Sequence, residues 1–181
     1  MYLEDELKTE VRVLQEKLFE LTGSRECLDA WQPHLTIGNG ILVDESKLMQ
    51  VESDIEALVK NENTFQVALE GFGGLTNRKG GEGEITTPYV LWVDVVVNKE
   101  LTELVGKVRD IITSKCELWY QMPKPYTPHV TLAFRDLSED GYSNGLDYLN
   151  GRSFNNSAQI SHIALVEKLP TADIEHKRFK F

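Results

Sequence analysis

Two short segments of the chain repeat one pattern of residues that can do acid-base chemistry. Residues 33–37 read Pro-His-Leu-Thr-Ile, and residues 128–132 read Pro-His-Val-Thr-Leu. Successive side chains of a strand point to opposite faces, so in a strand the His and Thr of each segment share one face and the apolar pair shares the other. The pattern therefore predicts two strands, each buried on one side and equipped for chemistry on the other.

The four polar side chains of these segments could act together on a phosphate group. An imidazole with a pKa of about 6.5 can accept a proton in one copy and donate one in the other near neutral pH. At a rise of about 3.3 Å per residue, the His and Thr of one strand stand about 7 Å apart, within reach of one phosphate. With the strands brought face to face, we expect His34 and His129 to be catalytic and Thr36 and Thr131 to bind phosphate oxygens. A single His-x-Thr is common in strands, and it is the duplication that favours function.

Length and composition limit the classes of function. The chain has 181 residues, of which 41% are hydrophobic and 27% charged, values typical of one globular unit. Its formal net charge of −10 argues against a long nucleic-acid footprint, which requires clustered Lys and Arg. A small nucleotide in a locally favourable cleft is compatible with this charge, and we expect a monomer.

No metal, cofactor or membrane is expected from the sequence. Cys27 and Cys116 have no C-x-x-C spacing, and the four His are scattered, with His162 expected to be structural and His176 exposed. No basic-then-apolar leader is present, and no apolar run approaches the roughly 20 residues of a membrane span. A cytoplasmic location is the default expectation.

Hydrophobic periodicity predicts the elements that would position the two segments. Helices are expected over 2–21, from a cap at Asp44 to Leu58, and from a cap at Asn98 to Ile112; strands are expected over 31–38, 64–70, 89–97, 128–134, 158–168 and 174–181.

Glycines modify this pattern in three places. Residues 138–150 read as a poor helix because Gly141 and Gly145 interrupt them. Residues 71–88 are rich in Gly and read as a long connection. Gly38 falls on the His face of the first segment, where it would leave room for a ligand.

Aligned on the two His, the chain reads as a structural repeat of strand, helix, motif strand, helix, strand. We expect one bilobal domain with a first half of about 1–75 and a second of about 89–181. The strand that matches 89–97 would precede Met1 in the first half. Either it is absent or another segment replaces it, for example residues 174–181.

Aromatic residues near the two segments could stack on a base, which contributes about 1 to 3 kcal/mol with little sequence preference. Trp31, Trp119 and Tyr126 are the candidates. Trp92 lies within a strongly apolar strand and is expected in the core.

The paired segments resemble the 2H phosphoesterases, which include the 2′-5′ RNA ligase-like proteins and the cyclic nucleotide phosphodiesterases. Residues 90–93 look like the strand these proteins place after their central loop, and residues 128–133 are very close to the second motif of the family. The resemblance covers about residues 28–168, and its paired motif is its specific part. Many relatives continue the second motif directly into Arg, whereas here Phe134 precedes Arg135. We expect Arg135 in solvent or at a remote part of a substrate.

The resemblance implies an α+β fold of two pseudo-symmetric lobes, each an antiparallel sheet with helices on its outer face, facing each other across a central cleft. It implies a metal-independent hydrolase of RNA processing that acts on 2′,3′-cyclic phosphates or 2′-5′ phosphodiesters of small nucleotides or RNA ends by two-histidine acid-base catalysis. Three alternatives stay open: 2′-5′ RNA ligase activity, a nucleotide-binding module without turnover, and a structural interaction protein that binds no phosphodiester. The sequence does not show which His is the base.

Overall fold

The computed structural model describes residues 1–76, 88–118, 125–169 and 173–181. Its largest sheet has four antiparallel strands in the order β5-β3-β2-β6, and two further antiparallel pairs join β7 to β8 and β1 to β4. The strands are β1 Ile41–Leu42, β2 Phe65–Leu75, β3 Val90–Val95, β4 Glu117–Leu118, β5 His129–Phe134, β6 Asn155–Ile160, β7 His162–Lys168 and β8 Asp173–Lys180.

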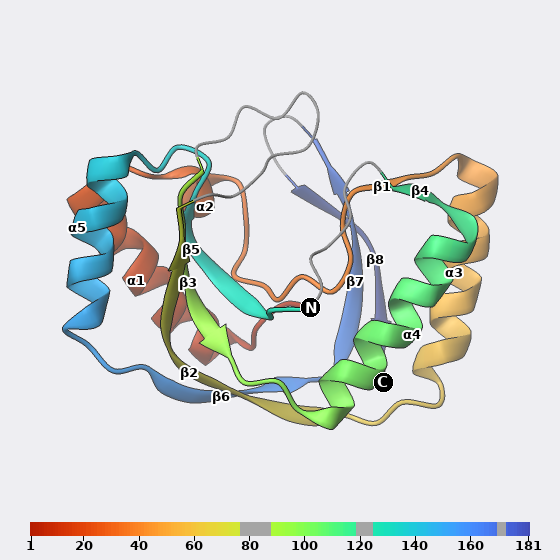
Figure 1. Cartoon of the computed structure of the whole chain (residues 1–181). Helices are drawn as coiled ribbons and strands as arrows, with labels where there is room; N and C mark the ends of the chain where they lie inside the picture. The colour runs from red at the N-terminus through yellow and green to blue at the C-terminus, as the bar shows by residue number, and fades with distance from the viewer. Residues whose placement is uncertain (77–87, 119–124, 170–172) are drawn as a thin grey trace.

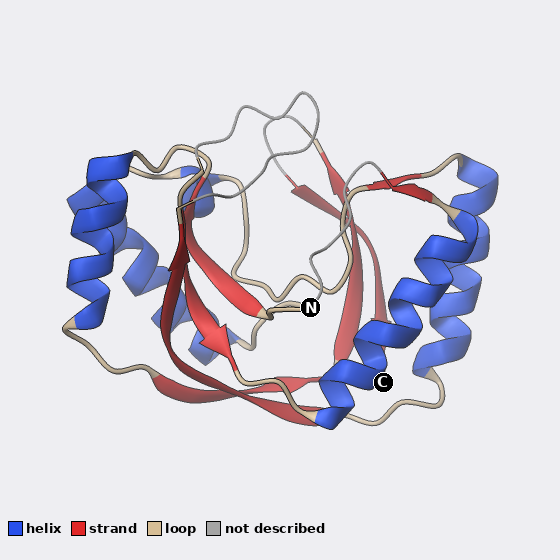
Figure 2. Ribbon diagram, in the orientation of Figure 1, coloured by secondary structure: helices blue, strands red, loops and turns tan. Residues whose placement is uncertain are grey.

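The longer helices lie on the two outer sides of the molecule with the strands between them, and one short helix lies close beside the strands (Figures 1 and 2). They are α1 Asp5–Thr22, α2 Glu26–Asp29, α3 Glu45–Val59, α4 Lys99–Lys115 and α5 Glu139–Asn150. Helix α1 packs on α5 and β5, beside the four-stranded sheet, whereas α3 packs on α4 and β8. The expected α+β fold with outer helices is therefore confirmed. No helix in the described parts of the chain is long and apolar enough to cross a membrane.

Helix ends follow the signals that the sequence offers. The side chain of Asp44 accepts a hydrogen bond from the backbone N–H of Lys47 (2.8 Å), and Asn98 does the same for Leu101 (2.8 Å). Gly23 ends α1 in the left-handed conformation, with φ of 76°. The two predicted caps are confirmed.

Helix α5 corrects the prediction that residues 138–150 form a poor helix. A Cβ at Gly145 would lie 2.6 Å from Cδ1 of Leu91, and one at Gly141 would lie 3.2 Å from Cβ of Thr22. Both glycines therefore let α5 approach its neighbours closely. Close packing outweighs the cost of about 1 kcal/mol that each Gly adds to a helix.

Two strand predictions are also corrected. Residues 158–168 do not form one strand, because the chain leaves β6 at Ile160 and begins β7 at His162 in a different sheet. Strand β2 extends to Leu75, so the first residues of the predicted Gly-rich connection belong to a strand. The rest of that stretch, residues 77–87, lies outside the described residues.

The sheets mix the two halves of the sequence. Strand β2 comes from the first half, yet it pairs with β3 and β6 of the second half. Helix α4 of the second half packs on α3 of the first. Each side of the molecule is thus built from both halves.

The N-terminal residues supply the extended segment that the predicted repeat lacks in its first half. The backbone N–H of Leu35 donates to the carbonyl of Met1 (2.8 Å), the Met1 nitrogen donates to the carbonyl of Leu35 (3.0 Å), and Tyr2 forms a bridge with His34. The helix predicted over 2–21 therefore begins only at Asp5. Residues 174–181 do not fill this place, because they pair with β7.

Candidate active site

The second motif lies on β5, which pairs along its length with β3. Val130 and Leu132 are 0% and 2% exposed and belong to the main core, whereas His129 and Thr131 are half-buried on the opposite face. The alternation predicted from the sequence is confirmed for this motif.

The first motif is not a regular strand, and the prediction of a strand over 31–38 is wrong. Its pairing consists of two isolated bridges, Tyr2 with His34 and Leu35 with Val130. Pro33 offers no N–H to a ladder, which limits regular pairing at this point. The predicted alternation of side chains is present nevertheless: Leu35 and Ile37 are buried in the main core, while His34 and Thr36 are half-buried on the other face.

The bridge between Leu35 and Val130 puts the two motifs side by side, not face to face as expected. In an antiparallel register this pairing sets His34 opposite Thr131 and Thr36 opposite His129, with Cβ atoms of opposite residues about 4.5 to 5.5 Å apart. Leu35 and Val130 both point into the core, so the four polar side chains share the other face. The structure thus brings together all four residues predicted to act on phosphate.

Both imidazoles are oriented in the same way. Nδ1 of His34 lies 2.7 Å from the carbonyl oxygen of Gln32, and Nδ1 of His129 lies 2.9 Å from that of Thr127. A carbonyl only accepts hydrogen bonds, so Nδ1 carries the proton in each neutral ring. Nε2 is therefore the nitrogen that gains or loses a proton in both histidines.

The two imidazoles differ in their electrostatic surroundings. Burial lowers the pKa of His34 to about 4, the Gln32 carbonyl opposes this, and the positive charges of the Met1 amino group and His129 add to it. Burial also lowers the pKa of His129, but the Thr127 carbonyl and the carboxylate of Asp94 act in the opposite direction.

Two polar side chains of helix α1 donate hydrogen bonds to backbone carbonyls in the second motif and just before the first. Nε2 of the buried Gln15 donates to the carbonyl of Thr131 (3.0 Å), and Oε1 of Gln15 accepts from Arg12 (3.1 Å). Arg12 also donates to the carbonyls of Leu28 and Trp31, just before the first motif. Sequence reasoning missed both residues. The available signal was Gln15 on the apolar stripe of the helix, where it is buried with Leu7, Val11 and Leu18.

Two of the three candidates for base stacking, Trp31 and Tyr126, have partners within the protein. Tyr126 donates from its hydroxyl to the carbonyl of Thr36 (2.7 Å), and burial raises its pKa. Trp31 stacks on Phe134 with ring centroids 5.7 Å apart. Trp119 lies outside the described residues.

Two further expectations are corrected near the second motif. Arg135 is not in solvent: its side chain is 17% exposed, and its guanidinium carbon lies 4.7 Å from the centre of the Trp31 ring. Its φ of 68° ends β5. Trp92 is not in the main core but on the His129 face of the sheet, with the two rings 5.0 Å apart.

Gly38 packs closely against α4. A Cβ at this position would lie 2.7 Å from Cδ1 of Ile112 on α4. The approach of the first motif segment to α4 therefore excludes any larger residue without a shift of that side chain.

The remaining histidines have structural contacts, in line with expectation. Nε2 of His162 accepts from the backbone N–H of Tyr2 (3.4 Å), and His176 pairs with Glu52 (2.8 Å) on the surface. Cys27 and Cys116 are free thiols. In the parts of the chain that the structure describes, no three His, Cys, Asp or Glu side chains gather closely enough to bind a metal ion.

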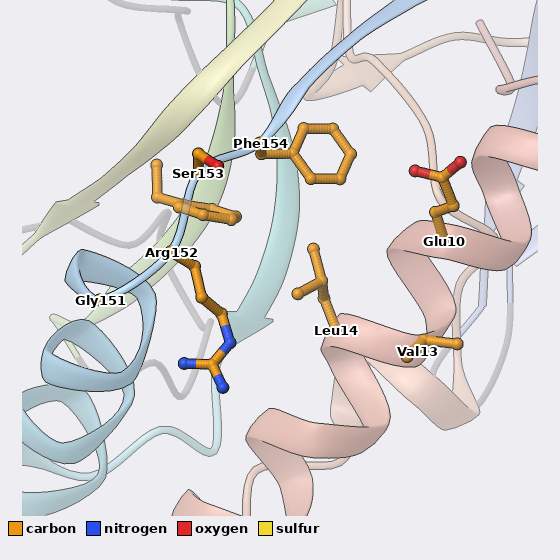
Figure 3. A pocket seen from close by; sticks show the side chains of 8 residues that line it. Glu10, Val13, Leu14, Gly151, Arg152, Ser153 and Phe154 are labelled. Carbon is orange, nitrogen blue, oxygen red and sulfur yellow. The ribbon is translucent and has the colours of Figure 1, made fainter.

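A surface hollow of about 540 Å³ lies between α1 and the segment that follows α5 (Figure 3). Glu10, Val13 and Leu14 line it on one side, and Arg152 and Phe154 on the other. A second hollow of about 430 Å³ lies beside His162 and Arg178. Neither lining includes a residue of the two motifs.

Solved structures share this fold. The chain aligns with TT0787 of Thermus thermophilus at a TM-score of 0.69 and 19% identity, over 99% of this chain and 93% of that one. It aligns with E. coli LigT, in a complex with 3′-AMP, at a TM-score of 0.62 and 19% identity, over 94% and 91% of the two chains. A structure described as a phosphoesterase gives 0.60 and 18%, also over 94% and 91%.

Sequence comparison identifies the family. No curated protein matches the chain, but the family described as the 2′-5′ RNA ligase superfamily matches it over residues 3–171. That span includes both motifs, strand β3 that pairs with the second motif, and helix α1; Met1 and Tyr2, which pair with the first motif, lie just before it. The chain therefore belongs to the 2′-5′ RNA ligase superfamily of 2H phosphoesterases.

Proposed function

We propose that this protein is a metal-independent phosphodiesterase that opens 2′,3′-cyclic phosphates or cleaves 2′-5′ phosphodiester bonds of small nucleotides or RNA ends. The observation that carries the proposal is the side-by-side pairing of the motifs, which puts two imidazoles and two threonines on one face. Within the described residues neither threonine hydroxyl is engaged in a hydrogen bond, so both are free to bind a ligand.

The reaction needs one proton acceptor and one proton donor on a common phosphate. For a 2′,3′-cyclic phosphate, neutral Nε2 of one His takes a proton from water as the water oxygen attacks phosphorus. The bond from phosphorus to one ribose oxygen breaks, and that oxygen receives the Nε2 proton of the other, protonated His. For a 2′-5′ linkage, the adjacent ribose hydroxyl replaces water as the nucleophile.

Thr36 and Thr131 would stabilise the charge that builds up on the nonbridging oxygens. Each threonine stands opposite the histidine of the other motif, so each hydroxyl would approach the phosphate from the side of the other strand. Fixed donors aimed at developing charge reduce the barrier because they need no reorganisation during the reaction.

A small substrate fits the charge of the chain. The net charge of −10 disfavours long nucleic acids, whereas one phosphodiester needs only a local site. A solved relative, E. coli LigT, binds 3′-AMP. The proposed ligand is thus a nucleotide or short RNA end, with Trp31, Trp119 and Tyr126 as proposed base contacts. A cytoplasmic monomer belongs to the same proposal.

Ligation is the second candidate, favoured by the family to which the chain belongs. It reverses 2′-5′ cleavage, and the same acid-base pair serves both directions. Nucleotide binding without turnover is the third. The three functions are separable by the products that form.

The test is turnover of a panel of 2′,3′-cyclic mononucleotides and 2′-5′ dinucleotides in excess EDTA, from pH 3 to 9, a range that includes the lowered pKa of His34. Wild-type protein is compared with His34→Ala and His129→Ala, and with His176→Ala as a matched control on the surface. We expect turnover in the chelator, a bell-shaped pH profile, and a loss of at least about a hundredfold in both motif variants only. Loss below about tenfold in either motif variant would refute the mechanism.

Product analysis decides among the three functions. Joining of RNA ends that carry a 2′,3′-cyclic phosphate to 5′-hydroxyl ends supports the ligase. Thermal stabilisation by a panel member without any product supports the binding module and refutes the enzyme.

A further inference from the structure

Two side chains of β3 face the second motif. Asp94 stands directly opposite His129 in the antiparallel register between β3 and β5, and Trp92 stands opposite Thr131. Asp94 and Trp92 are half-buried, while Val93 between them is fully buried. Both side chains therefore lie on the face of the sheet that carries the catalytic candidates.

The carboxylate of Asp94 has a fixed place on this face. Nε1 of Trp92 donates to Oδ1 of Asp94 (2.7 Å), and the indole lies against the His129 ring with centroids 5.0 Å apart. Gly73 on β2 makes this possible, because a Cβ there would lie 2.5 Å from Nε1 of Trp92. Indole, carboxylate and imidazole thus form one packed group.

The charges around the two histidines are unlike. In the described residues, the titratable groups that act on His129 are Asp94 on β3 and His34 of the first motif. A carboxylate stabilises an imidazolium close to it, and Asp94 acts on His129 in this way. No carboxylate of the described residues acts on His34, whose neighbours are His129 and the Met1 amino group, and burial lowers the pKa of that amino group to about 5. The field therefore favours a proton on His129 over a proton on His34.

We propose that Asp94, fixed by Trp92, is a positioning residue that stabilises the protonated form of His129, which makes His129 the general acid and His34 the general base. This inference rests on the proposed function, because it assigns the two roles that the function requires. Water gives a proton to Nε2 of His34 and its oxygen bonds to phosphorus. The departing ribose oxygen takes the proton from Nε2 of His129, and exchange with solvent restores both rings.

The assignment also gives a direction to the bound substrate. The ribose oxygen that leaves must lie on the side of β3 and β5, next to His129. The attacking water must lie on the side of His34 and the N-terminal residues. The phosphate sits between them, over the bridge that joins Leu35 to Val130.

The first test is an NMR titration of the histidine rings in the ligand-free protein, for wild type, Asp94→Asn, Trp92→Phe and Asp94→Glu. We expect the pKa of His129 to fall by about one pH unit in Asp94→Asn, by less in Trp92→Phe, and to recover in Asp94→Glu. Asp110→Asn, on the exposed face of α4, is the matched control and should leave both rings unchanged. An unchanged pKa of His129 in Asp94→Asn overturns the inference.

The second test is the pH profile of kcat on whichever panel substrate wild type turns over. Loss of the Asp94 carboxylate should move the alkaline limb, where the acid loses its proton, to lower pH by about one unit and leave the acid limb in place. Movement of the acid limb instead makes His129 the base and overturns the assignment.

The two tests separate failure of this inference from failure of the proposed function. If wild type turns over no panel member, the function fails and the acid and base roles fail with it. The titration still shows, independently of turnover, whether Asp94 controls the charge of His129.

Discussion

The two motifs have nearly the same sequence but are held in different ways. The second lies on β5, which pairs with β3 from His129 to Phe134 with one register shift between Thr131 and Ala133. The first forms only two isolated bridges, one of them with the N-terminal residues. Side chains also hold its backbone: Arg12 of α1 donates a hydrogen bond to the carbonyl of Trp31, and Tyr126 donates one to that of Thr36. One motif is positioned by a sheet and the other by a set of individual contacts.

This difference shows that a repeated function does not require a repeated scaffold. Each histidine meets a carbonyl two residues before it, and each motif buries its apolar pair, so the local geometry is shared. The long-range contacts are not shared. We therefore expect both motifs to be equally necessary for turnover but unequally robust to mutation.

The strongest test of equal necessity removes each imidazole in turn. His34→Asn and His129→Asn should each reduce kcat by about a hundredfold to ten-thousandfold, because each removes one half of a proton transfer pair. The double variant should be little worse than the weaker single variant, since residues that act as a unit are far from additive. Steady-state kinetics on a panel substrate, with circular dichroism to verify folding, measures this.

His176→Asn is the control, because that ring pairs with Glu52 on the surface. Losses that multiply in the double variant would mean that the two motifs act independently, and would contradict one shared phosphate.

The next largest effect should come from the hydrogen bonds that Arg12 donates to the segment just before the first motif. Arg12→Met keeps the side-chain stem but removes hydrogen bonds to the carbonyls of Leu28 and Trp31. Hydrogen bonds from a charged group contribute about 1.5 to 3 kcal/mol, so we expect the free energy of unfolding to fall by about 2 to 3 kcal/mol. Urea denaturation at pH 7.5 measures it.

Arg152→Met provides the comparison, since Arg152 donates to one carbonyl, that of Tyr148, at an exposed helix end. Its effect should stay within about 0.5 kcal/mol. Equal effects of the two substitutions would show that the first motif does not depend on α1.

The sequence predicted those structural features that depend only on residues close together in the chain, such as helix caps and the alternation of side chains in a strand. Asp44 and Asn98 cap helices where expected, and His129 and Thr131 alternate with buried neighbours, because each feature is decided within one turn or one strand. The sequence did not predict how the first motif is held. Its partners are Met1 at one end of the chain and Val130 far along it, and such pairing has no local signature.

The same reasoning explains the errors at glycines and at β3. Gly145 reads as a helix breaker until the position of Leu91 is known. Trp92 lies in an apolar strand and was expected in the core. Only the sheet shows that the main core covers the opposite face of that strand. Asp94, within an apolar strand, gave no signal that it stands opposite His129.

A smaller effect should follow from a change in the packing behind the second motif. Gly145→Ala puts a Cβ 2.6 Å from Leu91, next to the β3 strand that supports β5. Overpacking costs about 1 to 3 kcal/mol and the better helix propensity returns up to about 1, so we expect a net loss of about 1 to 2 kcal/mol. Gly106→Ala on α4, where a Cβ would meet nothing within 4 Å, should gain about 0.5 to 1 kcal/mol. Urea denaturation that gives the same sign for both would contradict this account of α5.

The smallest expected effect is a difference between the motifs in the pH dependence of stability. The pKa of His34 is about 4 in the folded chain and about 6.5 when unfolded, so the unfolded chain binds more protons between these values. Stability is then complete above pH 6.5 and is lost as the pH falls toward 4. Between pH 7.5 and 5, the free energy of unfolding of His34→Gln should therefore fall by about 1 kcal/mol less than that of wild type. This value is reduced to allow for solvent screening, because the ring is only half-buried. His129→Gln should remove less, because Asp94 opposes the lowering of the His129 pKa. Urea midpoints of wild type and both variants at the two pH values measure this, and a greater recovery in His129→Gln would reverse the order of the two histidines.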